Sequence, residues 1–99
     1  MRLVQAKNIY DIIVCKKGEE SNAIERGKLL VSLANSFEED IDIVSDRYII
    51  DAKSIMGIFS LNLCKPLKIV FHSNDDSRIK MFVEKMEEFN NGLRKVEES

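Results

Sequence analysis

The feature that most constrains the fold is the alternation of short β-branched stretches with amphipathic helical stretches along only 99 residues. Four stretches have the composition or the apolar–polar alternation typical of strands, and they cover residues 9–15, 41–45, 48–53 and 67–71. Three stretches repeat apolar residues at helical spacing, over residues 23–35, 54–61 and 79–89. The order β-α-β-β-α-β-α predicts an α+β fold, a two-layer open-faced sandwich in which three helices cover one face of a four-stranded antiparallel sheet.

The two central strands show the clearest alternation. Isoleucine and aspartate alternate over residues 40–43, so we expect Asp40 and Asp42 to share a solvated face and not to act as an acid–base pair. The polar residues 45–47 are short enough to join this strand to the next one. The sequence therefore predicts an antiparallel hairpin.

Helix boundaries are marked by residues that favour helix ends. Asn22 stands three residues before Glu25, which is an N-cap spacing, and Ser54 is a natural N-cap for the second helix. Pro66 disfavours helix at the residue before it. The dipeptide at 91–92 is Asn-Gly, a typical helix C-terminal stop.

Size and charge indicate a single domain over residues 1–99, with a core at about 9–91 and short extensions at both ends. The 15 Lys and Arg residues against 17 Asp and Glu give a net charge of −2, which argues against direct nucleic-acid binding. No apolar run is long enough to cross a membrane, and no stretch reads as a signal peptide. The expected location is a reducing cytoplasm.

No set of residues in the chain assembles a catalytic or cofactor-binding constellation. There is no phosphate-binding glycine loop, and the spacing of cysteine and histidine does not fit a metal site. The single histidine, His72, is expected to be an exposed residue at a strand end, and Cys15 and Cys64 are expected to pack as small apolar side chains. We therefore predict a protein that is not an enzyme and needs no cofactor or metal.

The second helix carries more apolar residues than one buried face requires. These residues are Ile55, Met56, Ile58, Phe59 and Leu61. Some of them should face solvent, and exposed apolar patches are typical of partner contacts. The alternative is that all five belong to the core.

Ser54 stands at the start of this helix. A phosphate on its hydroxyl would meet unpaired backbone N–H groups and the positive end of the helix dipole, so the position suits phosphorylation. An ordinary N-cap serine would show the same spacing.

The run Lys-Ser-Ile-Met-Gly-Ile-Phe-Ser-Leu at residues 53–61 closely resembles the regulatory-serine segment of HPr, the histidine-containing phosphocarrier of the sugar phosphotransferase system. Residues 29–37 are similar to the end of the first helix of that family, at the usual separation from the serine segment. The resemblance extends over roughly residues 10–90 and implies the same β-α-β-β-α-β-α order. It also implies a bacterial-type protein.

The same resemblance places the phosphorylated histidine of the family at position 23, where this chain has Ala23. The arginine that helps to hold the phosphoryl group falls at Glu25, and the helix-opening proline falls at Arg26. Alanine offers no nucleophile, and a carboxylate repels phosphate. Loss of histidine phosphotransfer is therefore expected, and His72 is not expected to replace the missing histidine.

A chain that keeps the serine segment and lacks the histidine is similar to catabolite repression HPr, a regulatory paralogue in this family. This similarity implies a regulatory or adaptor domain in carbon catabolite regulation, with Ser54 as the phosphoacceptor and Ile55, Met56 and Phe59 as the docking patch. The implied partner is an HPr kinase/phosphorylase-like enzyme or another regulatory protein, with the chain as a monomer or a strand-swapped homodimer. Two alternatives stay open: a phosphocarrier with a non-standard acceptor, or a decayed paralogue in which the Ser54 segment serves only the fold.

Overall fold

The computed structural model describes residues 8–46, 48–90 and 94–95, and these form three α-helices, one 3-10 turn and five strands. The elements are β1 (Ile9–Ile12), η1 (Glu20–Asn22), α2 (Ala23–Asn35), β2 (Ile41–Val44), β3 (Ile49–Asp51), α3 (Ile55–Phe59), β4 (Leu67–Phe71), α4 (Asp76–Asn90) and β5 (Arg94–Lys95). The predicted order of the first four strands and the three helices is confirmed. The predicted Asn-Gly stop at 91–92 and position 47 of the hairpin connection lie outside the described residues.

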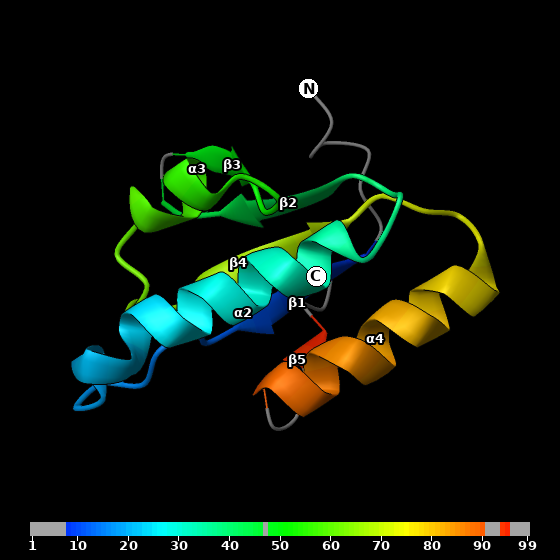
Figure 1. The fold of residues 1–99 in the computed structure, drawn as a ribbon. Helices are drawn as coiled ribbons and strands as arrows, with labels where there is room; N and C mark the ends of the chain where they lie inside the picture. Colours follow the sequence, from blue (N-terminus) through cyan, green and yellow to red (C-terminus); the bar gives the residue numbers. More distant parts are fainter. Residues whose placement is uncertain (1–7, 47, 91–93, 96–99) are drawn as a thin grey trace.

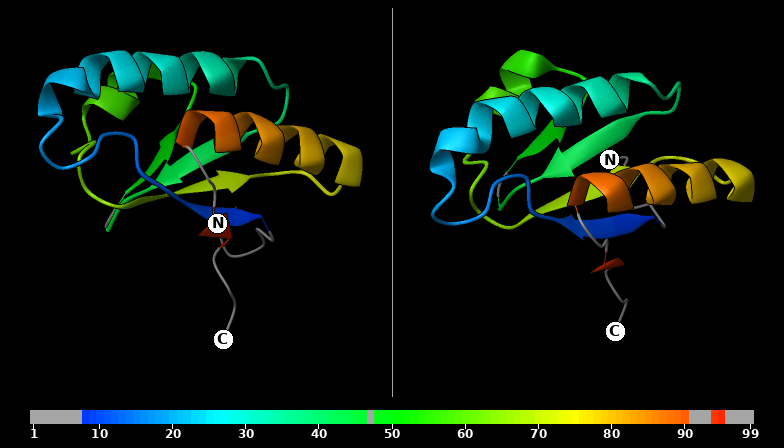
Figure 2. Two further views of the ribbon diagram at one scale, coloured as in Figure 1. Left: turned by 90° about the horizontal axis from the view of Figure 1, so that it is seen from below. Right: turned by 60° about the horizontal axis from the view of Figure 1, so that its bottom comes forward.

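All five strands form one antiparallel sheet with the order β3-β2-β4-β1-β5. The helices lie on one face of this sheet, with α2 and α4 across its centre and α3 beside α2 at the β3 edge (Figures 1 and 2). This is the predicted two-layer α+β sandwich. The two-residue strand β5 is an addition, because it pairs with β1 and extends the sheet beyond the four predicted strands.

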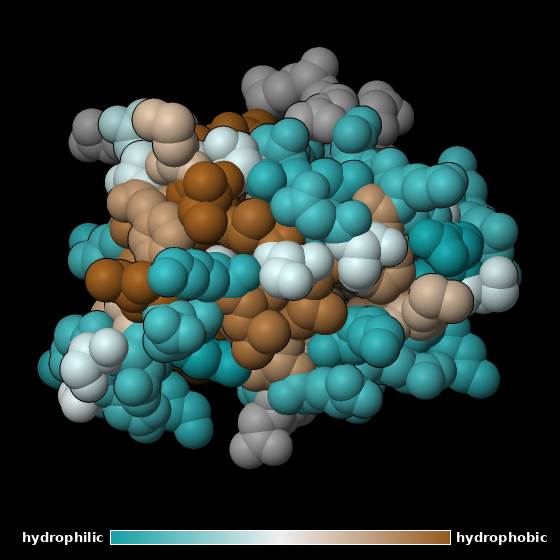
Figure 3. Space-filling model, viewed as in Figure 1, coloured by the Kyte–Doolittle hydropathy of each residue, from teal (hydrophilic) through white to brown (hydrophobic). Residues whose placement is uncertain are grey.

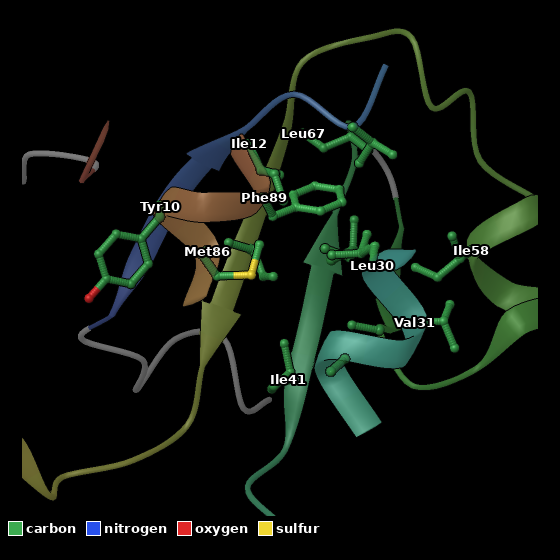
Figure 4. Close-up of a cluster of buried hydrophobic side chains, with 14 of the residues drawn as sticks. Tyr10, Ile12, Leu30, Val31, Ile41, Ile58, Leu67, Met86 and Phe89 are labelled. Carbon is green, nitrogen blue, oxygen red and sulfur yellow. The ribbon is translucent and has the colours of Figure 1, made fainter. Parts of the chain in front are cut away.

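The core fills the space between the sheet and the helices. Phe71 of β4 and Phe82 of α4 stack with ring centroids 4.3 Å apart, and Phe37 packs its edge against both rings. Figure 4 shows further members of this cluster, which come from β1, α2, β2, α3, β4 and α4: Tyr10, Ile12, Leu30, Val31, Ile41, Ile58, Leu67, Met86 and Phe89. Every predicted amphipathic element thus contributes its apolar face.

Several local predictions differ from the structure. Strand β3 and helix α3 are shorter than the predicted ranges 48–53 and 54–61. The first strand ends at Ile12 because the next backbone N–H, that of Ile13, donates to Asn90 Oδ1 at 2.9 Å and leaves the ladder. Asn22 is the N-cap residue of α2, as its spacing predicts, but its side chain makes no capping hydrogen bond. Its backbone is already helical, with φ −92° and ψ −2°, whereas a capping side chain needs an extended backbone. The turn η1 leads directly into α2 instead.

Candidate functional site

Ser54 occupies the predicted N-cap position of α3. Its backbone is extended, with φ −93° and ψ 113°, and its Oγ accepts a hydrogen bond from the Gly57 N–H at 3.2 Å. Gly57 has no room for a side chain, because a Cβ there would lie 2.6 Å from Ile50 Cγ2. The glycine therefore lets α3 sit directly on β3, and Ser54 is held at the exposed end of the helix.

Hydrogen bonds hold Lys53, the residue just before Ser54, to neighbouring parts of the protein. Lys53 Nζ donates to the Phe37 carbonyl at 2.7 Å, and Asn35 Nδ2 donates to the Lys53 carbonyl at 3.2 Å. The Lys53 N–H donates to Asp51 Oδ1 at 2.9 Å. These contacts tie the serine to the end of α2 and to β3, so the hydroxyl is presented on a fixed backbone.

The three apolar residues expected in a docking patch are all exposed. Met56 is 84% exposed, Ile55 47% and Phe59 38%, whereas Ile58 of the same helix is fully buried. The alternative in which all the apolar residues of this segment belong to the core is therefore wrong. Figure 3 shows apolar surface over α3 that continues toward α2.

The α2–α3 contact extends this apolar surface beyond the residues that the sequence singled out. A Cβ on Gly27 of α2 would lie 2.9 Å from Phe59 Cε1, so the two helices touch where the glycine leaves room. Ile24, one turn earlier on α2, is also exposed. The sequence did not distinguish Ile24, because its exposure depends on the way the two helices meet.

The beginning of α2 contains the positions that the sequence associated with phosphotransfer. Ala23 is half-buried and Glu25 is exposed. Arg26 instead points toward α4: its Nε donates to the Val14 carbonyl at 2.9 Å and its Nη2 to the Phe89 carbonyl at 2.6 Å. The guanidinium also lies 3.9 Å from the centroid of the Phe89 ring. Arg26 therefore links the end of β1 to the last turn of α4, where a cation interacts favourably with the helix dipole.

His72 lies at the other end of the sheet. The register pairs Ile12 with Leu67 at the end of β1 that leads to α2, whereas His72 follows the opposite end of β4. Its Nε2 is 2.8 Å from Asp42 Oδ2, and its side chain is only 18% exposed. The prediction of an exposed strand-end histidine is therefore wrong.

The predicted solvated face of Asp40 and Asp42 is also only half correct. Asp40 is exposed, but Asp42 is 1% exposed and contacts His72. A buried carboxylate needs polar partners to offset the loss of hydration. The alternation correctly predicts strand β2, but the outer face of this strand is buried at Asp42.

The two cysteines, 49 residues apart in the sequence, come together between the end of β1 and the loop before β4. Cys15 is buried and Cys64 half-buried, and both are free thiols. The Cys64 thiol is a hydrogen-bonding neighbour of the Cys15 thiol, and this contact together with burial raises the pKa of Cys15 to about 11. The prediction of two separate packing residues missed this pairing.

Among the described residues, no group of three or more histidine, cysteine or acidic side chains could hold a metal ion. The same part of the chain has no helix that is long and apolar enough to span a membrane. The candidate site is therefore the exposed Ser54 hydroxyl together with the exposed apolar side chains of α3.

Comparison with known proteins identifies the family. Residues 26–91, about two thirds of the chain, match the family described as PTS HPr component phosphorylation site. The crystal structure of HPr-C-His from Thermoanaerobacter tengcongensis matches with a TM-score of 0.61 and 23% sequence identity, over 87% of this chain and 98% of that chain. That similarity supports the fold, and no curated protein matches the sequence. Because the family match covers more than half of its length, the chain belongs to the HPr family.

Proposed function

We propose that this protein is a regulatory or adaptor member of the HPr family that is switched by phosphorylation of Ser54 and carries no phosphoryl group on histidine. HPr proteins are phosphocarriers of the phosphotransferase system and not catalytic enzymes. The observation that carries the proposal is the exposed Ser54 hydroxyl beside three exposed apolar side chains. A kinase can reach the hydroxyl, and a partner that covers the apolar side chains would meet the added charge.

The loss of histidine phosphotransfer is supported by the residues at the start of α2. Ala23, at the position where the resemblance places the histidine, has no nucleophilic atom, and the neighbouring Glu25 is an exposed carboxylate. His72 lies near the opposite end of the sheet and its Nε2 contacts the buried Asp42. These residues favour a domain that is recognised by other proteins over one that passes phosphate on.

The effect of phosphorylation follows from the geometry of the N-cap. Ser54 Oγ accepts from the Gly57 N–H at 3.2 Å, so a phosphoryl group on this oxygen stays next to the first turn of α3. It adds about two negative charges and three acceptor oxygens. Met56 and Ile55 lie within the first turn, so the modification changes the charge of the surface that a partner would contact.

A kinase assay tests the phosphoacceptor. Purified HPr kinase and ATP should add one phosphate to the unaltered protein and none to Ser54→Ala. The matched control is Ser60→Ala, because Ser60 is also exposed and lies at the other end of the same helix. If the unaltered protein is not modified, or Ser54→Ala is modified equally, the proposed switch is wrong.

A second assay tests the docking patch, which consists of Ile55, Met56 and Phe59. Met56→Asp removes the most exposed apolar side chain of the patch without opening the core, and we expect it to raise the KM of the kinase at least about tenfold, as expected of a central contact residue. Met81→Asp is the matched control, since Met81 is an exposed methionine on α4. Equal KM values for both variants would contradict docking through α3.

The phosphocarrier alternative has its own test. The protein is incubated with the phosphoenolpyruvate-dependent enzyme of the phosphotransferase system and a labelled donor. We expect no acid-labile label on the chain. Acid-labile label that survives in Ser54→Ala and disappears in His72→Gln would show a non-standard acceptor and overturn the proposed loss of histidine phosphotransfer.

A further inference from the structure

Two thiols from distant parts of the sequence meet beside the start of α2. The Cys15 N–H donates to the Leu63 carbonyl at 3.2 Å, so the segment after β1 runs against the residue that precedes Cys64. The Leu63 carbonyl belongs to the peptide group that joins Leu63 to Cys64, so this bond places the backbones of Cys15 and Cys64 next to each other. Disulfides join cysteines on such neighbouring backbones, with Cα separations of about 4.4–6.8 Å.

The side chains are consistent with this placement. The Cys64 thiol is near enough to raise the pKa of the Cys15 thiol, and both cysteines are free thiols. Cys15 is 2% exposed, whereas Cys64 is half-buried and is reached from solvent. Such a pair has one accessible thiol to meet an oxidant and one protected thiol to resolve the product.

We propose that Cys15 and Cys64 are a redox modification site that forms a reversible intramolecular disulfide. The oxidant is a low-molecular-weight disulfide. Cys64 loses its proton to solvent and attacks one sulfur of that disulfide, which gives a mixed disulfide and releases one small thiolate. Cys15 then loses its proton and attacks Cys64 Sγ, which releases the second small thiolate. The two protein thiols are oxidised to one disulfide, and the small disulfide is reduced to two thiols after the thiolates take up protons.

The disulfide also acts on the loop that precedes α2. In the reduced protein, Cys15 Sγ donates to the Glu19 carbonyl at 3.1 Å. A disulfide sulfur carries no hydrogen, so oxidation removes this donor. The Glu19 carbonyl then keeps the Asn22 N–H, which donates to it at 2.9 Å, but loses the thiol donor. We therefore expect the loop at residues 16–22 to exchange its amide hydrogens faster in the oxidised protein.

The proposal is tested with the full chain in buffers of oxidised and reduced glutathione. The monomer should lose the mass of two hydrogen atoms, and proteolytic mapping should recover one peptide pair joined between Cys15 and Cys64. The equilibrium constant for disulfide formation in the native protein should exceed that in concentrated guanidinium chloride by at least about tenfold, because the fold raises the effective concentration of one thiol at the other. Addition of dithiothreitol should restore both thiols.

Cys64→Ser is the matched control, because it replaces only the accessible sulfur and should form no intramolecular bond. The proposal is overturned if the native chain gives only glutathione adducts or intermolecular dimers at every ratio. It is equally overturned if the denatured chain forms the bond as readily as the native one. Unchanged amide exchange at residues 16–22 in the oxidised protein would contradict the coupling to the loop. None of these outcomes depends on phosphorylation of Ser54.

Discussion

Replacement of Arg26 by alanine provides a stringent test of how this fold is held together. Its guanidinium donates to the carbonyls of Val14 and Phe89, at 2.9 and 2.6 Å, and lies over the Phe89 ring. Arg26→Ala removes all three contacts at once. Both carbonyls then depend on water, and the link between the end of β1 and the last turn of α4 is lost.

The expected cost follows from these contacts. Hydrogen bonds from a charged donor contribute about 1.5 kcal/mol each at the lower end of their range, which suits Arg26 because it is only partly buried. The cation–π contact adds about 0.5–1 kcal/mol. Release of the arginine side chain returns roughly 1 kcal/mol of conformational entropy. We expect the free energy of unfolding to fall by about 2–3 kcal/mol, which lowers Tm by roughly 10–20 °C in a domain of this size.

Urea unfolding followed by circular dichroism measures this loss directly. The midpoint should fall by about 2 M with an unchanged m-value, because the change is in stability and not in the surface exposed. Lys28→Ala is the matched control, since it removes a positive charge from an exposed position two residues further along α2. A loss below about 0.5 kcal/mol in Arg26→Ala, or an equal loss in both variants, would refute the structural role of Arg26.

Three further variants test other contacts. His72→Ala takes one partner from the buried Asp42 carboxylate and should destabilise the protein by about 1–3 kcal/mol in urea unfolding. The neighbouring Cys64 thiol and burial raise the pKa of Cys15 to about 11. The reduced protein should therefore lose stability as pH rises from about 9 to about 11. In Cys15→Ala, Tm should not show this decrease. The Arg78 guanidinium lowers the pKa of Glu39, so stability is present above about pH 4.5 and is lost as pH falls further. The advantage of the unaltered protein over Glu39→Gln, about 1 kcal/mol or less after solvent screening, should therefore disappear in acid unfolding titrations.

Much of the fold could be read from the sequence because its elements carry strong local signals. The helix over residues 23–35 was predicted with its observed bounds, and its apolar spacing is the reason. Ser54 was identified as an N-cap because the extended serine before an apolar helical run is a local signal. A surplus of apolar residues on this short helix predicted that some of them are exposed, and the resemblance to HPr named Ile55, Met56 and Phe59, which are exposed.

The predictions that differ from the structure depend on contacts that local sequence patterns do not show. The burial of Asp42 depends on what covers the outer face of β2, which alternation along one strand does not reveal. Asn22 had an N-cap spacing, but the preceding turn η1 gave it a helical backbone that a capping side chain does not adopt. The strand β5 is only two residues long, too short to give a periodic pattern.

The sequence by itself determined the order of the elements, the α+β class and the place of the exposed serine, because periodicity and capping act between residues a few positions apart. Tertiary structure alone decided which distant groups meet. It brought Cys15 to Cys64, His72 to Asp42, and Arg26 to the end of α4. These contacts join residues 30 to 63 positions apart along the chain. They depend on sheet order and helix packing, which no local pattern encodes.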